Sequence, residues 1–403
     1  MRNYIYIFFA AVLLATSCNK EPQYIGGNDY FPIFHGYMQF ATEVSSRSKL
    51  AADMKGKSFG VIGFEYSKTS TWSGAKSTTA PSVFYNQKVD CDAANGTCTY
   101  DVDSNASGNQ PKQWGDYRYA FFAYHPHNGA GIELSKQSAT NTPTLTYTYG
   151  WLNTTGNISA YDSNAPIFDL MTAEAVDLTS ANGRVALDFK HRLFALEVLA
   201  NNYNENEYEY ETNSNGEFIL DANGKKTYKL DDDGNKIIKV SARQKISSLT
   251  LTLEGLNHTK MTIPLSTKDG EVDPIYTKGN VGTRTFKLSD ETVVVPAFNE
   301  TTEDGRGEGV ATSISLMGSN NGGYLTFIPQ PGTNEGLKGT LNWTELEYFQ
   351  GEEKEVSNEF TSTIDFLPGK LYQVYINFVG DGITIALIEA GNWDNWNVTH
   401  TFE

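Results

Sequence analysis

The chain has 403 residues, 13% of them aromatic, and a formal net charge of -17 at pH 7. A chain of this length is longer than an ordinary domain with a single hydrophobic core, which indicates two domains. The acidic balance argues against nucleic acid and anionic lipid headgroups as partners, because both repel negative charge.

An apolar run begins the chain. It spans residues 4–15 behind Arg2, which matches the hydrophobic part of a secretory signal peptide and is too short to cross a bilayer. It ends in Leu14-Ala15-Thr16-Ser17-Cys18, which resembles the lipobox of bacterial lipoproteins. That resemblance implies a signal peptide over residues 1–17, lipidation of Cys18, an outer-membrane anchor of two or three acyl chains, and a tether over residues 18–33. The alternative is a plain signal peptide with an incidental cysteine.

The other two cysteines, Cys91 and Cys98, flank six residues that include Asn95-Gly96. In an oxidising compartment they are expected to form a disulfide that closes a hairpin turning at Asn95-Gly96. A metal site is the poorer interpretation, because two cysteines need further ligands at suitable spacing and none stands nearby.

Most of the mature chain shows the period-2 alternation of strands, with abundant Thr, Tyr, Phe and Val. Runs rich in Gly, Asn, Ser and Thr separate these segments, as in sandwiches with exposed turns. The pattern predicts an all-β protein. The clearest strands are expected at residues 119–124, 145–149, 184–199, 249–253, 324–328 and 371–388.

Residues 201–245 do not follow this alternating pattern. Turn signals recur there as Asn215-Gly216, Asn223-Gly224 and Asp233-Gly234, which predicts a charged meander of hairpins outside the core. Asp231, Asp233 and Asn235 alternate as calcium ligands would, but Gly234 is misplaced for an EF-hand loop and no bidentate Glu follows at its spacing. A hairpin turn is the favoured interpretation.

The sequence contains no nucleophile elbow, Gly-rich phosphate loop or H-E-x-x-H zinc motif. His125 and His127 form a possible metal pair, although Pro126 between them marks a strand end and no third ligand can be named. The two catalytic carboxylates of a glycosidase cannot be identified from sequence, because they come together only in the folded chain. We therefore predict neither an enzyme nor a cofactor.

Six tryptophans are present, and aromatic rings stack on sugars as well as pack in cores. Trp72 and Trp151 have loop-like neighbours, which makes them the candidate glycan-binding residues. Core packing is the simpler explanation for most of the six.

Four segments carry a family resemblance when taken in order. They are Met38-Gln39-Phe40 with Ser46-Arg47-Ser48 and residues 59–64; residues 167–173 around Asp169-Leu170-Met171; residues 185–198; and residues 367–393, which begin Leu367-Pro368-Gly369-Lys370-Leu371-Tyr372. Together they resemble the fimbrillin family of Bacteroides-type bacteria, the subunits of type V pili.

This resemblance implies two tandem transthyretin-like β-sandwich domains, here over residues 34–200 and 246–403, with residues 201–245 as a hairpin-rich insertion. It also implies assembly by strand replacement, in which a strand from another subunit fills an exposed groove. The matching protease cleavage site is Arg47, with Lys49 as a rival, and residues 34–40 would be the displaced strand. Residues 382–388 or 397–402 would be the donor. The alternative for Arg47 is an ordinary exposed turn residue.

The predicted function is therefore a fimbrial subunit precursor that mediates adhesion. Its partners would be other pilin subunits, the outer membrane through the acyl anchor, and a glycan or protein on a host or bacterial surface. A stalk role predicts cleavage, whereas an anchor role predicts that the lipid stays. A monomeric surface lipoprotein that binds glycans is the alternative, and a hydrolase is the least supported.

Overall fold

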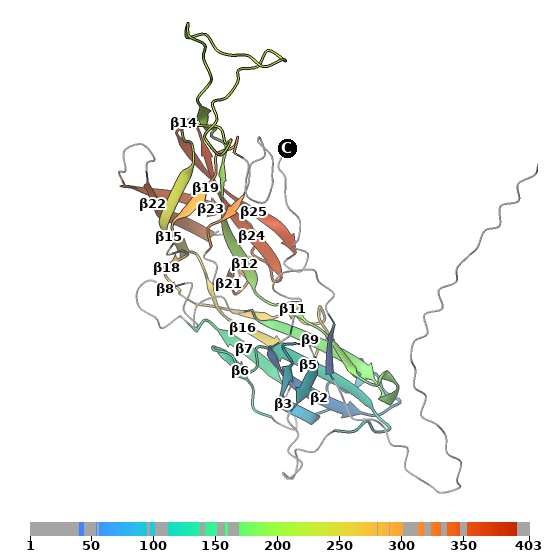
Figure 1. The fold of residues 1–403 in the computed structure, drawn as a ribbon. Helices are drawn as coiled ribbons and strands as arrows, with labels where there is room; N and C mark the ends of the chain where they lie inside the picture. Colours follow the sequence, from blue (N-terminus) through green and yellow to red (C-terminus); the bar gives the residue numbers. More distant parts are fainter. Residues whose placement is uncertain are drawn as a thin grey trace, which may run out of the picture. The chain divides into compact units, whose positions relative to one another are not determined.

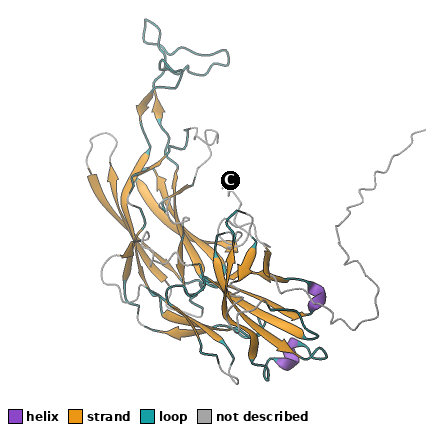
Figure 2. Cartoon of the chain, turned by 60° about the horizontal axis from the view of Figure 1, so that its bottom comes forward, coloured by secondary structure: helices purple, strands orange, loops and turns teal. Residues whose placement is uncertain are grey.

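The computed structural model describes residues 40–43, 54, 56–94, 97–100, 112–137, 142–150, 158–159, 169–279, 281–289, 291–300, 313–317, 324–331, 337–346 and 353–392. Within these residues the regular structure is almost entirely strand (Figure 2). The exceptions are the short helix α1 (Trp72–Ala75) and the 3-10 turn η1 (Ser180–Asn182). The prediction of an all-β protein is confirmed. No helix in the described part has the length and apolar character needed to cross a bilayer.

Two sheets contain the first strands of the chain, coloured blue to green in Figure 1. The first sheet has eight strands, in spatial order β10 (Val185–Asp188), β1 (Phe40–Glu43), β4 (Cys98–Tyr100), β3 (Pro81–Cys91), β2 (Ser58–Tyr66), β5 (Arg118–His125), β9 (Met171–Leu178) and β11 (Lys190–His191). The second has four, in the order β17 (Ile275–Lys278), β16 (His258–Pro264), β7 (Thr144–Thr148) and β6 (Ile132–Leu134).

Two further sheets are built mainly from the later part of the chain. One has the order β23 (Glu353–Ser362), β22 (Leu337–Leu346), β15 (Gln244–Glu254), β18 (Arg284–Lys287) and β8 (Ile158–Ser159), with β19 (Val293–Val295) also on β15. The other has the order β20 (Ile314–Ser315), β12 (Phe194–Asn202), β24 (Lys370–Val379) and β25 (Gly382–Asn392), with β21 (Leu325–Phe327) also on β12. A small fifth sheet pairs β13 (Glu207–Tyr208) with β14 (Ile238–Val240).

Strand alternation accounts for the way the first sheet is buried on both faces. In β5, Tyr119, Phe121 and Ala123 belong to one hydrophobic cluster, whereas Ala120, Phe122 and Tyr124 belong to the other. Successive side chains point to opposite faces of a strand, so a continuous apolar run such as this one requires cover on both sides.

Strand pairing does not follow chain order across residue 200. Strand β16 (His258–Pro264) pairs with β7 (Thr144–Thr148), and β12 (Phe194–Asn202) pairs in parallel with β24 (Lys370–Val379). A single boundary near residue 200 therefore does not separate the sheets. Local sequence carries no signal for such pairings, because each strand edge is complementary to many others.

Candidate functional site

The short strand β1 lies inside the first sheet rather than at its edge. Residues Phe40 to Glu43 pair in parallel with Val185 to Asp188 of β10, and Phe40 also lies opposite Cys98 of β4. Of the predicted displaced segment, residues 34–40, the structure describes only Phe40. The strand that the structure describes instead continues to Glu43.

The predicted disulfide between Cys91 and Cys98 is confirmed. The two residues lie directly opposite one another where β3 and β4 pair, and both are buried. The predicted turn at residues 95–96 lies outside the described residues. The bond holds β4, the strand beside β1, against the sheet.

Strand β25 contains the first of the two predicted donor segments. It pairs antiparallel with β24 through a tight turn at Gly380, where a positive φ of 57° suits glycine. Ile383, Ile385 and Leu387 alternate along it and pack against the main hydrophobic cluster of the same chain. The second predicted donor, residues 397–402, lies outside the described residues.

Residues 207–240, here called the hairpin arm, contain no buried residue. Backbone hydrogen bonds, rather than a hydrophobic core, hold the arm together. Glu211, Ile219 and Thr227 form a closed ring in which each N–H donates to the carbonyl of another member, at 2.8–3.0 Å. A second ring joins residues 209, 229 and 237, with each bond at 2.9 Å. The arm, which ends with β14, is at the top of Figure 1.

Three equivalent turns build this arm. In each one a side-chain oxygen, from Asn213, Asp221 or Asp231, accepts hydrogen bonds from the backbone N–H groups two and four residues later, at 2.7–3.0 Å. A glycine with φ of 80–85° follows in each turn, where other residues would be strained. These bonds also hold the carboxyl pKa of Asp221 and Asp231 below the usual value. The predicted meander is confirmed at all three turn signals, and the Asp231 side chain serves the turn.

Aromatic rings and lysines pack against one another on one face of the arm. Tyr210 stacks on Tyr228, with ring centroids 5.0 Å apart. The ammonium of Lys226 lies 3.8 Å from the centroid of the Phe218 ring, and that of Lys236 lies 4.4 Å from the centroid of Tyr228. Such cation–π contacts contribute about 0.5–1 kcal/mol each at exposed sites.

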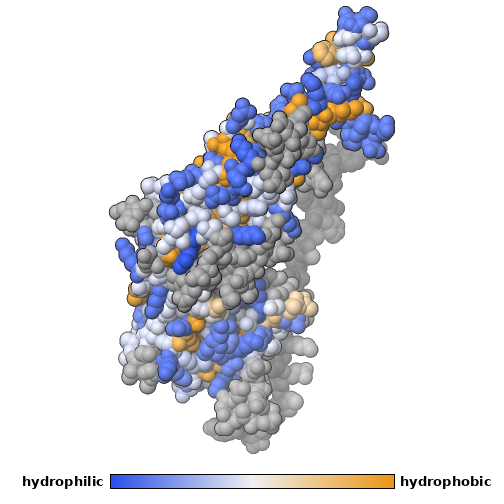
Figure 3. Space-filling model, turned by 90° about the vertical axis from the view of Figure 1, so that its left-hand side faces the viewer, coloured by the Kyte–Doolittle hydropathy of each residue, from blue (hydrophilic) through white to orange (hydrophobic). Residues whose placement is uncertain are grey.

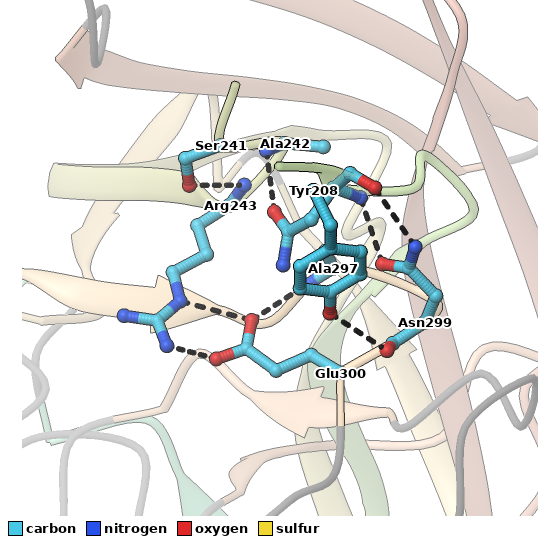
Figure 4. Close-up of polar contacts among 8 residues, drawn as sticks. Tyr208, Ser241, Ala242, Arg243, Ala297, Asn299 and Glu300 are labelled. Carbon is cyan, nitrogen blue, oxygen red and sulfur yellow. Dashed lines mark hydrogen bonds and ion pairs between the residues drawn. The ribbon is translucent and has the colours of Figure 1, made fainter. Parts of the chain in front are cut away.

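A polar network joins the base of the arm to the loop after β19 (Figure 4). The backbone N–H of Asn206 donates to Asn299 Oδ1 at 2.7 Å, and Asn299 Nδ2 donates back to the Asn206 carbonyl at 2.9 Å. The Tyr208 hydroxyl donates to the Asn299 carbonyl at 3.1 Å. These bonds tie the base of the arm to that loop.

An ion pair completes this network. The Arg243 guanidinium binds both carboxylate oxygens of Glu300, with Nε 2.9 Å from Oε2. Burial opposes ionisation of the Glu300 carboxyl, but the hydrogen bonds and charge of Arg243 hold its pKa below the usual value. Planar two-bond pairs of this kind resist rotation and so orient the segments that carry them.

A hollow of about 380 Å³ lies beside β9, β11 and β16. Its apolar lining includes Phe122 and Leu265, and charged residues surround it. Asp269 bridges Lys190 at 3.0 Å and Arg192 at 2.7 Å. Burial opposes ionisation of Asp269, but the charge of Arg192 holds its carboxyl pKa below the usual value.

The structure corrects the prediction that Trp72 binds glycans. The Trp72 side chain is 0% exposed, and its ring packs against Phe64, Tyr66 and Phe122. Its Nε1 donates to the Ser266 carbonyl at 2.8 Å. The neighbours that looked loop-like form α1 and the turns around it, which place the ring in the core, where no sugar can stack on it.

Three other predicted site residues, Cys18, Arg47 and Trp151, lie outside the described residues. His125 is buried, and its Nδ1 lies 2.7 Å from the Ser58 carbonyl, so that nitrogen serves the fold. Burial lowers the pKa of both His125 and His127. Among the described residues, no three His, Cys, Asp or Glu side chains form a metal-binding group.

The sequence interpretation missed the residues that fix the arm, namely Asn206, Arg243, Asn299 and Glu300. Arg243 and Glu300 are 57 positions apart, and Asn206 and Asn299 are 93 apart. Neither pair belongs to a local motif. Only the turn signals between residues 213 and 234 indicated that an arm exists.

The chain is similar to known proteins in sequence and in fold. A sequence model described as fimbrillin-like matches residues 54–290. A fimbrial protein from Bacteroides vulgatus has a similar structure, with a TM-score of 0.56, 15% identity, and coverage of 89% of this chain and 99% of that protein. Weaker similarity is found to a cell adhesion protein from Bacteroides uniformis, with a TM-score of 0.42, 12% identity and coverage of 89% and 98%. No curated protein matches the chain.

Proposed function

This chain belongs to the fimbrillin-like family, and we propose that it is the lipid-anchored precursor of a fimbrial subunit that assembles by strand replacement and mediates adhesion. Cys18 would carry the acyl anchor at the outer membrane. Other pilin subunits would be its partners, together with a surface glycan or protein as the adhesion ligand.

The position of β1 carries this proposal. The strand is only four residues long, yet it lies between β10 and β4 and follows β10 in parallel. Its removal would expose the backbone N–H and C=O groups of β10 and β4 that pair with it. An exposed strand edge pairs readily with an extended segment of another chain.

Cleavage would make that exchange possible. Arg47 follows β1 by four residues, so a cut after Arg47 would release the strand together with the lipid at Cys18. The chain would lose few long-range contacts, because β1 pairs along only four residues of β10. A stalk subunit requires this cut, whereas an anchor subunit keeps its lipid.

The mature N-terminus tests the proposal directly. Mass spectrometry would be applied to protein from native cells, in membrane and in sheared-surface fractions. Acylated Cys18 in the membrane and a start at Ser48 in the sheared fraction are expected for a processed subunit. Acylated Cys18 alone, with residues 34–47 still attached, would indicate an anchor or a monomeric lipoprotein such as a glycan binder.

A deletion strain provides the second test. If surface fibres and adhesion were unchanged without this chain, and it never co-purified with other pilins, the proposed function would fail. An unmodified N-terminus elsewhere would refute the lipid anchor and leave the fimbrial role to be judged by the deletion strain.

A further inference from the structure

Removal of β1 would leave a slot between β10 and β4. Among the described strands, β10 pairs with β1 alone, whereas β4 pairs with both β1 and β3. Neighbouring strands of a sheet lie about 4.8 Å apart, so β10 and β4 would stand roughly 10 Å apart, which leaves room for one strand. An incoming strand would find backbone partners along both of its edges.

The wall of the slot that β4 forms is held by the Cys91–Cys98 disulfide. Strand β4 has only three residues, and it pairs with β3 through three residue pairs. Cys98 is the β4 residue that lies opposite Phe40 of β1, and it is also the residue bonded to Cys91 of β3. The covalent bond thus fixes the part of β4 that faces the slot.

The other contacts of β4 hold this end less firmly. The Tyr100 hydroxyl accepts a hydrogen bond from the Lys112 N–H at 3.1 Å, and its ring packs against β3, but Tyr100 is two residues away from Cys98. One backbone hydrogen bond, from the Asp92 N–H to the Thr97 carbonyl at 2.9 Å, closes the end near Cys98. A short strand paired on one side frays readily, since a single hydrogen bond adds little net stability in water.

With β1 in place, the strands around it expose no large apolar side chain. Thirteen large hydrophobic residues are exposed in the described part of the chain, and none of them lies in β3, β4 or β10. Five lie instead in the hairpin arm, which shows orange and pale orange among the blue at the top of Figure 3. The slot would become available only after β1 has left, so the uncut chain should not bind a strand there.

We propose that the Cys91–Cys98 disulfide keeps β4 in place as the second wall of this slot, so that an incoming strand of another pilin subunit is bound along both edges. Strand β1 itself is bound in this way, parallel to β10 and antiparallel to β4. A strand bound along one edge alone leaves the backbone groups of its other edge to water and is displaced more easily. The inference rests on the proposed strand replacement and deepens it, since it gives the two cysteines a positioning role.

The rate at which a strand leaves the slot tests this role. In the full mature chain, a recognition sequence for a site-specific protease would replace residues 45–48, so that the folded chain can be cut after β1. The cut chain would take up a fluorescent peptide of residues 34–47, present in excess over the cut fragment. Release of the peptide would be timed by anisotropy after unlabelled peptide is added. The uncut chain is the control and should take up none.

The variant without the bond is Cys91→Ala with Cys98→Ala. We expect it to release the peptide at least about tenfold faster than the natural chain, because β4 must then be ordered at the expense of binding. Leu341→Ala controls for a general loss of stability, since it removes a buried side chain from β22 in a different sheet. It should leave the release rate unchanged.

A relocated disulfide separates the effect of the bond from that of side-chain packing. Asp90 and Thr99 are the next directly opposed pair of β3 and β4, and both are exposed. Opposed residues of an antiparallel pair lie within the Cα separations that disulfides span. Asp90→Cys with Thr99→Cys, added to the alanine variant, should restore slow release when oxidised and lose it again when reduced.

The possible results separate this inference from the proposed function. Equal release rates from the natural and alanine chains, or a relocated bond that restores nothing, would overturn the role of the disulfide and leave strand replacement standing. A cut natural chain that takes up no peptide after its cut fragment has left would refute strand replacement, and this inference with it. The deletion strain still judges the fimbrial role separately.

Discussion

Replacing both Cys91 and Cys98 by alanine is expected to loosen β4 and, through it, β1. The disulfide joins residues separated by seven positions in the sequence. Chain entropy for a loop of this size amounts to about 2.5 kcal/mol. Strand β4 has only three residues and pairs with β1 through Phe40 and Cys98, so the loss should appear locally rather than across the whole chain.

Hydrogen exchange measured by mass spectrometry checks this prediction. A local loss of about 2.5 kcal/mol corresponds to exchange up to about 70-fold faster for residues 98–100. The amides of the β24–β25 pair serve as the internal control and should not change. Unchanged exchange in β4 would refute the reasoning, since it would show that packing of the β3–β4 pair holds the strand without the bond. Faster release of β1 would connect the disulfide to subunit exchange.

Three further predictions concern the core and the arm. Trp72→Ala should destabilise the fold by about 3–5 kcal/mol in urea unfolding, because the ring is fully buried; a loss of glycan affinity without destabilisation would contradict this. The Glu300 carboxyl has a lower pKa folded than unfolded, so its contribution is complete at neutral pH. It should be lost as the pH falls below about 4.3 and through the folded pKa, and Glu300→Gln should remove that dependence from pH-dependent unfolding. Gly224→Ala should cost about 1–2 kcal/mol in the arm alone, because its φ is 80°, and amide exchange confined to the arm would verify it.

The arm shows how far local patterns reach. Asn215-Gly216, Asn223-Gly224 and Asp233-Gly234 predicted three hairpin turns, and all three form, because such turns are determined by residues a few positions apart. The contacts at the base of the arm, such as that of Arg243 with Glu300, instead join residues that are distant in sequence. The hollow is likewise lined by residues that are far apart in the sequence, namely 122, 172–174, 188, 190–192, 263–265, 267–270, 272–274 and 368–369.

For Trp72, in contrast, the local pattern led to a wrong prediction. Polar and small neighbours made its surroundings look like an exposed loop, yet the ring lies in the core. Burial depends on what packs against a residue, and the partners of the Trp72 ring, Phe64 and Phe122, come from the separate strands β2 and β5. Local composition does not contain that information.

The sequence by itself determined the all-β class, the disulfide and the hairpin turns, because strand alternation, two cysteines seven positions apart and Asn-Gly or Asp-Gly turns act over short distances. Only the tertiary structure decided that β1 lies inside a sheet, that β16 returns to pair with β7, and that Arg243 and Glu300 form an ion pair near the base of the arm. These features depend on which strand edges and charges meet after long stretches of chain have closed. Such meetings are selected by the packing of the whole molecule, so no single segment of the sequence specifies them.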